Sequence, residues 1–287
     1  MARKPAVAGM FYEADEQDLI RSIEKCFVSR FGPGKIPEVT DKRIGRLLGL
    51  VCPHAGYIYS GQAAAHAYFE LAKDGLPDIA IILGPNHHGL GAVAAVGTQA
   101  EWITPLGSMQ VDLEVAGQIT RLAEFATSDD SAHVREHSVE VQLPFLQYIS
   151  RGHKNIRIVP ITLAYLNKPD ALLLTQDLGN AIAQSIKGKS AVIIASSDLT
   201  HYESRDSARA KDTLAIDHVL NLDPEGLIET VYDRSITMCG VLPTAVMLHA
   251  CKVLGATGAR KLAYYSSGDI TGEVDQVVGY GALSVEA

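Results

Sequence analysis

The sequence has little of what nucleic-acid-binding or membrane-spanning proteins usually show. It holds 33 acidic residues against 25 lysines and arginines, which gives a formal net charge of −8. A protein that follows a phosphate backbone usually presents a basic stripe, and this chain has no block of like charge. No apolar run approaches the ~18 residues of a transmembrane helix. We therefore expect neither a nucleic-acid partner nor a membrane partner.

Cysteine is also scarce, and its placement does not suggest disulfides. The four cysteines are far apart in the sequence and none has CxxC spacing: Cys26, Cys52, Cys239 and Cys251. Such scatter is typical of a reducing compartment. The first residues include Arg3 and Lys4 but no apolar segment of a secretory signal. These features predict a cytoplasmic location.

Several common catalytic signatures are missing as well. The sequence contains no GxGxxG after a strand, no GxxxxGK[ST], no HExxH and no GxSxG. We therefore expect no nucleotide cofactor and no serine-hydrolase chemistry.

What the sequence does contain is an alternation of apolar strands and helices. Continuous apolar runs predict strands, and helical periodicity predicts helices between them. The predicted strands are 46–52, 78–84, 155–162 and 190–196, and the predicted helices are 16–28, 61–72, 111–124 and 136–148. Strands that are apolar throughout indicate a mostly parallel central sheet with helices on both faces. Segments 262–266 and 277–285 are expected to add edge strands, and we predict a single α/β domain over residues 1–287.

Three of the predicted strands end in polar clusters that contain histidines. The clusters are PHAGY at 53–57, GPNHHG at 84–89 and SSDLTHY at 196–202. Ligands of open α/β sheets bind outside the carboxyl ends of the strands, so we expect His54, His87, His88 and His201 near one site. A single histidine at a strand end is more typical of a hydrogen-bonded structural residue. Four of them in three such motifs predict a metal or catalytic site, and imidazole suits zinc, copper, iron and nickel.

A third ligand is not fixed by the strand order. Asp198, Glu136, Glu140 and Cys239 are the candidates, and we expect His137 at the rim of the pocket. Cys239 taken alone is more typical of a small buried apolar residue. However, it precedes a glycine at a predicted loop-to-helix junction, and a helix N-terminus lowers the pKa of a thiol.

Asp198 and His201 are three residues apart and could form an imidazole oriented by a carboxylate. The alternative is that Asp198 only caps the following helix. Tyr57 and Tyr59 are expected to line the same pocket, as part of an aromatic rim.

Five motifs in order carry a resemblance to a known family: PHAGYIYSG, LGPNHHG, EHSVEVQLPFLQ, SSDLTHY and MCGVLP. With these motifs the chain resembles the Memo family, from Ala6 to Leu283. That family is similar in fold to the class III extradiol dioxygenases, which are non-haem iron enzymes. The resemblance implies a metal pocket of His54, His87 and Cys239. It also implies that His201, supported by Asp198, takes the place of an acid/base histidine.

One position departs from the extradiol pattern of two histidines and a carboxylate. Cys239 stands where the resemblance implies the carboxylate, and a thiolate favours softer metals or a redox role. Iron or copper is the expected cofactor, with zinc less favoured. The functions we weigh are a metal-dependent oxidoreductase acting on a small, aromatic molecule, a scaffold that binds a peptide or small ligand, and a copper- or iron-handling redox protein. Memo-like proteins of prokaryotes are associated with radical-SAM and AMMECR-domain partners, which the resemblance extends to this chain as an expectation.

Overall fold

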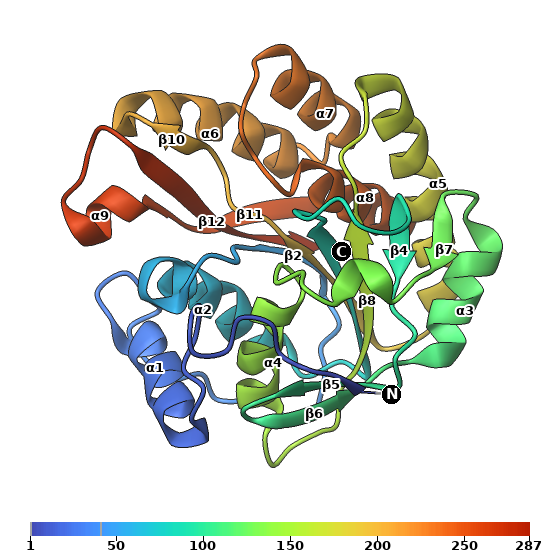
Figure 1. Cartoon of the computed structure of the whole chain (residues 1–287), viewed down its shortest axis with the longest axis horizontal. Coiled ribbons are helices and arrows are strands. Elements are labelled where there is room, and N and C mark those ends of the chain that lie inside the picture. The colour runs from blue at the N-terminus through green and yellow to red at the C-terminus, as the bar shows by residue number, and fades with distance from the viewer. Residues whose placement is uncertain (1, 41) are drawn as a thin grey trace.

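The computed structural model describes residues 2–40 and 42–287, and these form a mixed β-sheet between two layers of helices (Figure 1). The helices are α1 (Glu16–Val28), α2 (Tyr57–Asp74), α3 (Leu113–Leu122), α4 (Leu143–Ser150), α5 (Lys168–Ile186), α6 (Arg205–Leu220), α7 (Pro224–Asp233), α8 (Val241–Val253) and α9 (Ser267–Thr271), with 3-10 turns η1 (Ser131–His133) and η2 (Glu140–Gln142). The strands are β1 (Ala2–Arg3), β2 (Leu47–Cys52), β3 (Ile79–Pro85), β4 (Ala94–Val96), β5 (Glu101–Thr104), β6 (Gly107–Gln110), β7 (Ala126–Ser128), β8 (Arg157–Leu163), β9 (Ala191–Ser196), β10 (His201–Glu203), β11 (Gly258–Ser266) and β12 (Val277–Glu286).

The four strands predicted from apolar runs form the parallel centre of the main sheet. Their order is β2-β9-β3-β8, and every pair in it is parallel. β12 joins β2 in the antiparallel direction, and β4 does the same beside β8. A small second sheet contains β1, β5 and β6. The predicted α/β class with a mostly parallel centre is confirmed.

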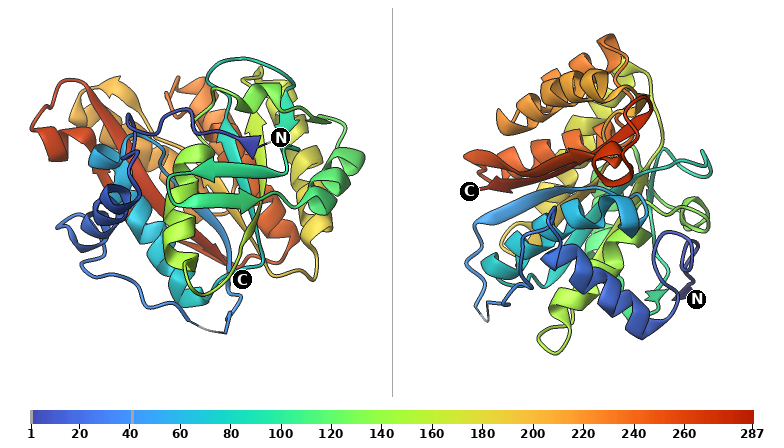
Figure 2. Two further views of the ribbon diagram at one scale, coloured as in Figure 1. Left: turned by 60° about the horizontal axis from the view of Figure 1, so that its bottom comes forward. Right: turned by 90° about the vertical axis from the view of Figure 1, so that its left-hand side faces the viewer.

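Burial on both faces explains why the central strands are apolar throughout. Along β3, Ile79, Ile81 and Leu83 pack into the core on the side of α5, α7 and α8, whereas Ala80 and Ile82 pack on the side of α1, α2 and α4. Two views from other directions show these helix layers on opposite sides of the sheet (Figure 2). A strand covered on both faces has no side left for polar residues.

Two predictions about secondary structure were wrong. The segment 277–285 does not form an edge strand, because β12 bonds to β2 along one side and to β11 along the other. The helix predicted over 136–148 begins only at Leu143, after the η2 turn. The preceding residues 134–139 form a loop, because the Glu136 side chain accepts from the backbone N–H groups of His137 and Ser138. Such local side-chain bonds compete with helix formation.

Within residues 2–40 and 42–287, we find no helix with the length and apolar character needed to cross a membrane.

Candidate metal centre

The histidine motifs lie side by side because β2, β9 and β3 are adjacent parallel strands. His54 follows the end of β2 by two residues, Asp198 follows β9 by two, and His87 follows β3 by two. Parallel neighbours end at the same edge of the sheet, so these three positions share that edge.

Three imidazoles meet at this edge and form what we call the histidine cluster: His54, His87 and His137. One ring nitrogen from each lies within 4.8 Å of the others, a spacing that could hold a metal ion. The ring centroids of His87 and His137 are 4.7 Å apart, and His54 lies 5.3 and 5.6 Å from them. His54 is buried, while the His87 side chain is 32% exposed and leaves the cluster open to solvent on that side.

Hydrogen bonding fixes which nitrogen of His54 is free. Its Nδ1 lies 2.8 Å from Oγ of Ser196. Ser196 has a single hydroxyl proton, which it donates to the carbonyl of Ser138 at 2.6 Å, so its oxygen must accept from Nδ1–H of His54. Nε2 of His54 therefore carries the lone pair that can bind a metal.

A single buried carboxylate, that of Glu136, lies beside both other histidines and fixes the free nitrogen of His87. Its Oε1 lies 2.9 Å from Nδ1 of His87 and 3.4 Å from Nδ1 of His137. Its Oε2 accepts from the backbone N–H of His87 at 2.6 Å. An ionised carboxylate only accepts hydrogen bonds, so Nδ1 of His87 is the protonated nitrogen and Nε2 is free. Metal-ligating histidines in proteins are commonly oriented by a carboxylate in this way.

The electrostatics of the pocket favour neutral imidazoles at His54 and His137 and an ionised carboxylate at Glu136. Burial, followed by the neighbouring histidines, holds the pKa of His54 well below its usual range, and burial also lowers the pKa of His137. Burial alone would raise the pKa of Glu136, but hydrogen bonds from the side chain of His87 and the backbone of Ser138 help to bring that pKa below its usual range. Neutral imidazole is the form that binds metals.

Cys239 lies beside the cluster without belonging to it. Its Sγ is 3.4 Å from Nε2 of His54, and it accepts from the backbone N–H of Asp198 at 3.3 Å. It is outside the group of mutually close ligand atoms, in which His137 is the third member. It does precede helix α8, as predicted, but the pKa of its thiol is raised rather than lowered, because burial and the nearby Asp198 outweigh the helix N-terminus. Ligation by Cys239 stays a prediction.

Asp198 and His201 do not form the direct pair that their spacing suggested. The Asp198 carboxylate accepts from the backbone N–H of His54 at 2.9 Å, and burial raises its pKa. Nδ1 of His201 instead faces the carbonyl of Thr237 at 2.9 Å, and its backbone N–H donates to Oγ1 of Thr237 at 2.7 Å. A carbonyl only accepts, so Nδ1 of His201 is protonated and its Nε2 is free. The backbone carbonyl of Thr237, and not the carboxylate of Asp198, therefore orients this ring.

Other residues predicted for the pocket make contacts of their own, and their role in the pocket stays a prediction. Tyr57 is buried and donates its hydroxyl to the carbonyl of Val141, so it belongs to the core. His88 is exposed and its Nε2 bonds to the carbonyl of Arg135. Tyr59 is 40% exposed on helix α2, and its carbonyl accepts from Tyr265. His87 and His88 are adjacent in a turn but make different contacts, since His87 bonds to Glu136 and His88 to the carbonyl of Arg135.

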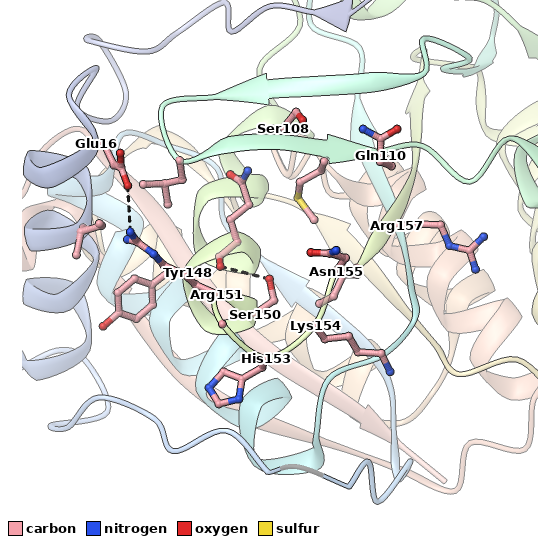
Figure 3. A pocket seen from close by; sticks show the side chains of 16 residues that line it. Glu16, Ser108, Gln110, Tyr148, Ser150, Arg151, His153, Lys154, Asn155 and Arg157 are labelled. Carbon is pink, nitrogen blue, oxygen red and sulfur yellow. Dashed lines mark hydrogen bonds and ion pairs between the residues drawn. The ribbon is translucent and has the colours of Figure 1, made fainter.

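A large cavity lies away from the histidine cluster. A cavity of about 830 Å³ lies between α1, β6 and the loop before β8, beside the amino end of β8 (Figure 3). Its basic side chains already have acidic partners: Arg151 pairs with Glu16, and Arg157 pairs with Asp112. The chemistry of the histidine cluster, and not cavity size, therefore identifies the candidate site.

Sequence reasoning placed Glu136 and His137 at the pocket but did not recognise His137 as a member of the cluster. The sequence did contain an indication of this, since EHS at 136–138 places a carboxylate directly before an imidazole. The predicted helix hid it, because a helix would have turned His137 away from Glu136.

The fold and the cluster define an α/β protein with a three-histidine group that could hold a metal ion. A family model described as Memo-like protein matches residues 3–284, and on this match the chain belongs to the Memo family. It is 44% identical over 285 residues to a MEMO1 family protein of Methanobrevibacter smithii, covering 98% of this chain and 99% of the relative. A MEMO1 family protein of Methanopyrus kandleri is 45% identical, covering 99% and 98%.

A solved structure has the same fold at low sequence identity. It is the crystal structure of an uncharacterized protein from Escherichia coli K12, with a TM-score of 0.55 and 13% identity. The match covers 82% of this chain and 100% of that one. At this identity the likeness concerns the fold alone.

Proposed function

We propose that this protein is a metal-dependent oxidoreductase whose transition-metal ion is held by His54, His87 and His137. The observation that carries the proposal is the convergence of three imidazoles, of which His54 and His87 have Nδ1 occupied and Nε2 free. Three protein ligands that leave a position open are typical of catalytic metal sites.

The residues present fit a transition metal. Imidazole nitrogens suit iron, copper and zinc, whereas magnesium and calcium prefer oxygen donors. The carboxylate of Glu136 supplies the orienting contact that such ligands usually have. Iron or copper remains the favoured metal, with zinc less favoured. When bound, such an ion would supply Lewis-acid and redox chemistry.

We assign the movement of a proton to His201. Its protonated Nδ1 is held by Thr237, which leaves Nε2 as a general base. A small phenolic molecule bound on the open side of the cluster would offer a hydroxyl proton to this base.

Elemental analysis tests the metal site directly. Protein purified without chelators is expected to contain about one transition-metal ion per chain, and metal-depleted protein should bind Co²⁺ or Fe²⁺ with the same stoichiometry. His137→Ala should weaken this binding, whereas His88→Ala, which removes the exposed neighbour of His87, should not. Protein that contains no metal and binds none in titration would refute the proposal.

Cys239 supports a second candidate, a copper- or iron-handling redox protein. Its sulfur lies 3.4 Å from Nε2 of His54, close enough to join the ligands after a small movement. On this alternative, Cys239→Ala should lose Cu⁺ affinity by tenfold or more, while an unchanged affinity would remove it. A defined turnover that His201→Ala abolishes in the folded protein would favour the enzyme over this candidate and over a ligand-binding scaffold. The cytoplasmic location and the radical-SAM and AMMECR-domain partners stay predictions.

A further inference from the structure

The loop that carries Glu136 and His137 has no regular secondary structure to hold it. Residues 134–139 lie between η1 and η2, and no helix or strand includes them. A ligand on such a loop needs other contacts to stay in place, because a small displacement of a functional side chain is enough to impair a site. Residues 3–12, which we call the N-terminal strap, provide contacts of this kind.

We propose that the N-terminal strap is the positioning element of the metal centre and that Arg3 is its central positioning residue. The proposal rests on the proposed function, in which His137 is the third ligand. It goes further by assigning a role in metal binding to residues more than 120 positions away in the sequence.

Arg3 ties several points of the loop together. Its Nη2 donates to the carbonyl of Glu136 at 2.5 Å, and its Nε and Nη2 donate to the carbonyl of His133 at 3.2 and 3.1 Å. Its Nη1 forms an ion pair with Glu140. Both charged side chains are buried. A planar guanidinium can reach these acceptors at once, whereas the ammonium of lysine is a single point of charge.

Glu140 binds further groups of the strap through its carboxylate. Its carboxylate accepts from the backbone N–H groups of Ala6 and Val7 at 2.8 and 3.1 Å and from the hydroxyl of Tyr12 at 2.5 Å. Every one of these donors belongs to the strap. Buried charges are costly unless they are paired and hydrogen-bonded. The Arg3–Glu140 pair meets both conditions, since Arg3 also donates to the loop and Glu140 also accepts from the strap. The strap and the loop are therefore expected to be ordered together.

Phe11 completes the connection at the histidine cluster. Its ring meets the ring of His137 edge-on, with centroids 4.7 Å apart. Its carbonyl accepts from the backbone N–H of Tyr57 at 2.8 Å, just after the segment that carries His54. The strap thus contacts His137 directly and also contacts the segment after His54.

A structural anchor alone would also explain these contacts, so the test must separate stability from ligand placement. Arg3→Lys keeps the positive charge beside Glu140 but loses the fork that reaches the carbonyls of His133 and Glu136. Glu140→Gln weakens the strap from the opposite side. Arg43→Lys is the matched control, since Arg43 also bonds two carbonyls, those of Leu47 and Ala191, at the far end of β2 and β9.

Co²⁺ titration of the full-length metal-depleted protein, followed by visible absorption, measures affinity and ligand geometry together. Urea unfolding measures stability, and emission from Trp102, the single tryptophan, reports on the strap because the Arg3 guanidinium lies 4.5 Å from its ring. We expect Arg3→Lys and Glu140→Gln to lower Co²⁺ affinity about tenfold or more and to change the Co²⁺ spectrum, as substitutions around metal ligands usually do. Arg43→Lys should change neither.

If both strap variants bind Co²⁺ with the affinity and spectrum of the parent while His137→Ala loses affinity, the strap does not position the ligand and this inference is wrong. If the parent binds no Co²⁺, or His137→Ala binds as the parent does, the proposed metal centre fails and the inference fails with it. Should Arg3→Lys not fold, Phe11→Leu, which removes only the ring contact with His137, is subjected to the same titration and the same criterion.

Discussion

Replacing Glu136 by glutamine should weaken both metal binding and the stability of the fold, and the size of each effect can be worked out from its contacts. Oε1 faces Nδ1 of His87 and the backbone N–H groups of His137 and Ser138, and Oε2 accepts from the backbone N–H of His87. Glutamine has one acceptor oxygen. If the glutamine oxygen takes the place of Oε1, the NH₂ group takes the place of Oε2. It then faces the backbone N–H of His87, so two donors meet.

The loss has two measurable parts. One hydrogen bond to a charged acceptor contributes about 1.5–3 kcal/mol, so Glu136→Gln should lower the free energy of unfolding by about 2 kcal/mol. Loss of the orienting carboxylate should weaken Co²⁺ binding by about 10–100-fold. That range corresponds to about 1.4–2.8 kcal/mol of binding free energy.

Urea unfolding and Co²⁺ titration of the same preparations provide the assay. Glu70→Gln is the control, since Glu70 pairs with Lys73 and Arg260 near the surface of α2. Pairs of that kind contribute about 0–1 kcal/mol, and none of them touches the histidine cluster. Co²⁺ affinity of Glu136→Gln within twofold of the parent would refute the view that Glu136 orients the ligands.

Two further predictions concern stability. Burial lowers the pKa of His133 to about 4, while its unfolded value is about 6.5. Between those values the unfolded chain binds more protons, so stability should fall by about 3 kcal/mol as the pH drops from about 6.5 to about 4, and His133→Gln should flatten this part of the unfolding profile. A profile that keeps its slope in the variant would assign the effect to other groups. Gly84→Ala should destabilise the protein by about 1–3 kcal/mol, because the added Cβ would lie 2.3 Å from Oγ of Ser138, in the loop that carries His137. Gly258→Ala, where the Cβ meets nothing within 4 Å, should leave the melting temperature unchanged, and equal melting temperatures for both variants would contradict this reasoning.

The central strands could be predicted because their cause is local. A strand covered on both faces must be apolar at every position, as Ile79 to Leu83 are, and such a run can be recognised without knowing its neighbours. The adjacency of His54 and His87 followed from the general rule that ligands bind at the carboxyl ends of parallel strands. The place of β12 inside the sheet could not be predicted, because pairing partners are decided by the whole topology.

The amino-acid sequence alone determined the α/β class, the family and the edge of the sheet where the histidines gather, since each depends on patterns within short segments. Only the tertiary structure decided that His137 completes the cluster, that Thr237 rather than Asp198 orients His201, and that burial raises the pKa of Cys239. Those outcomes depend on contacts between segments far apart in the chain. The contact of Arg3 with Glu140 is an example, because a buried guanidinium bonds to whichever acceptors the fold brings to it.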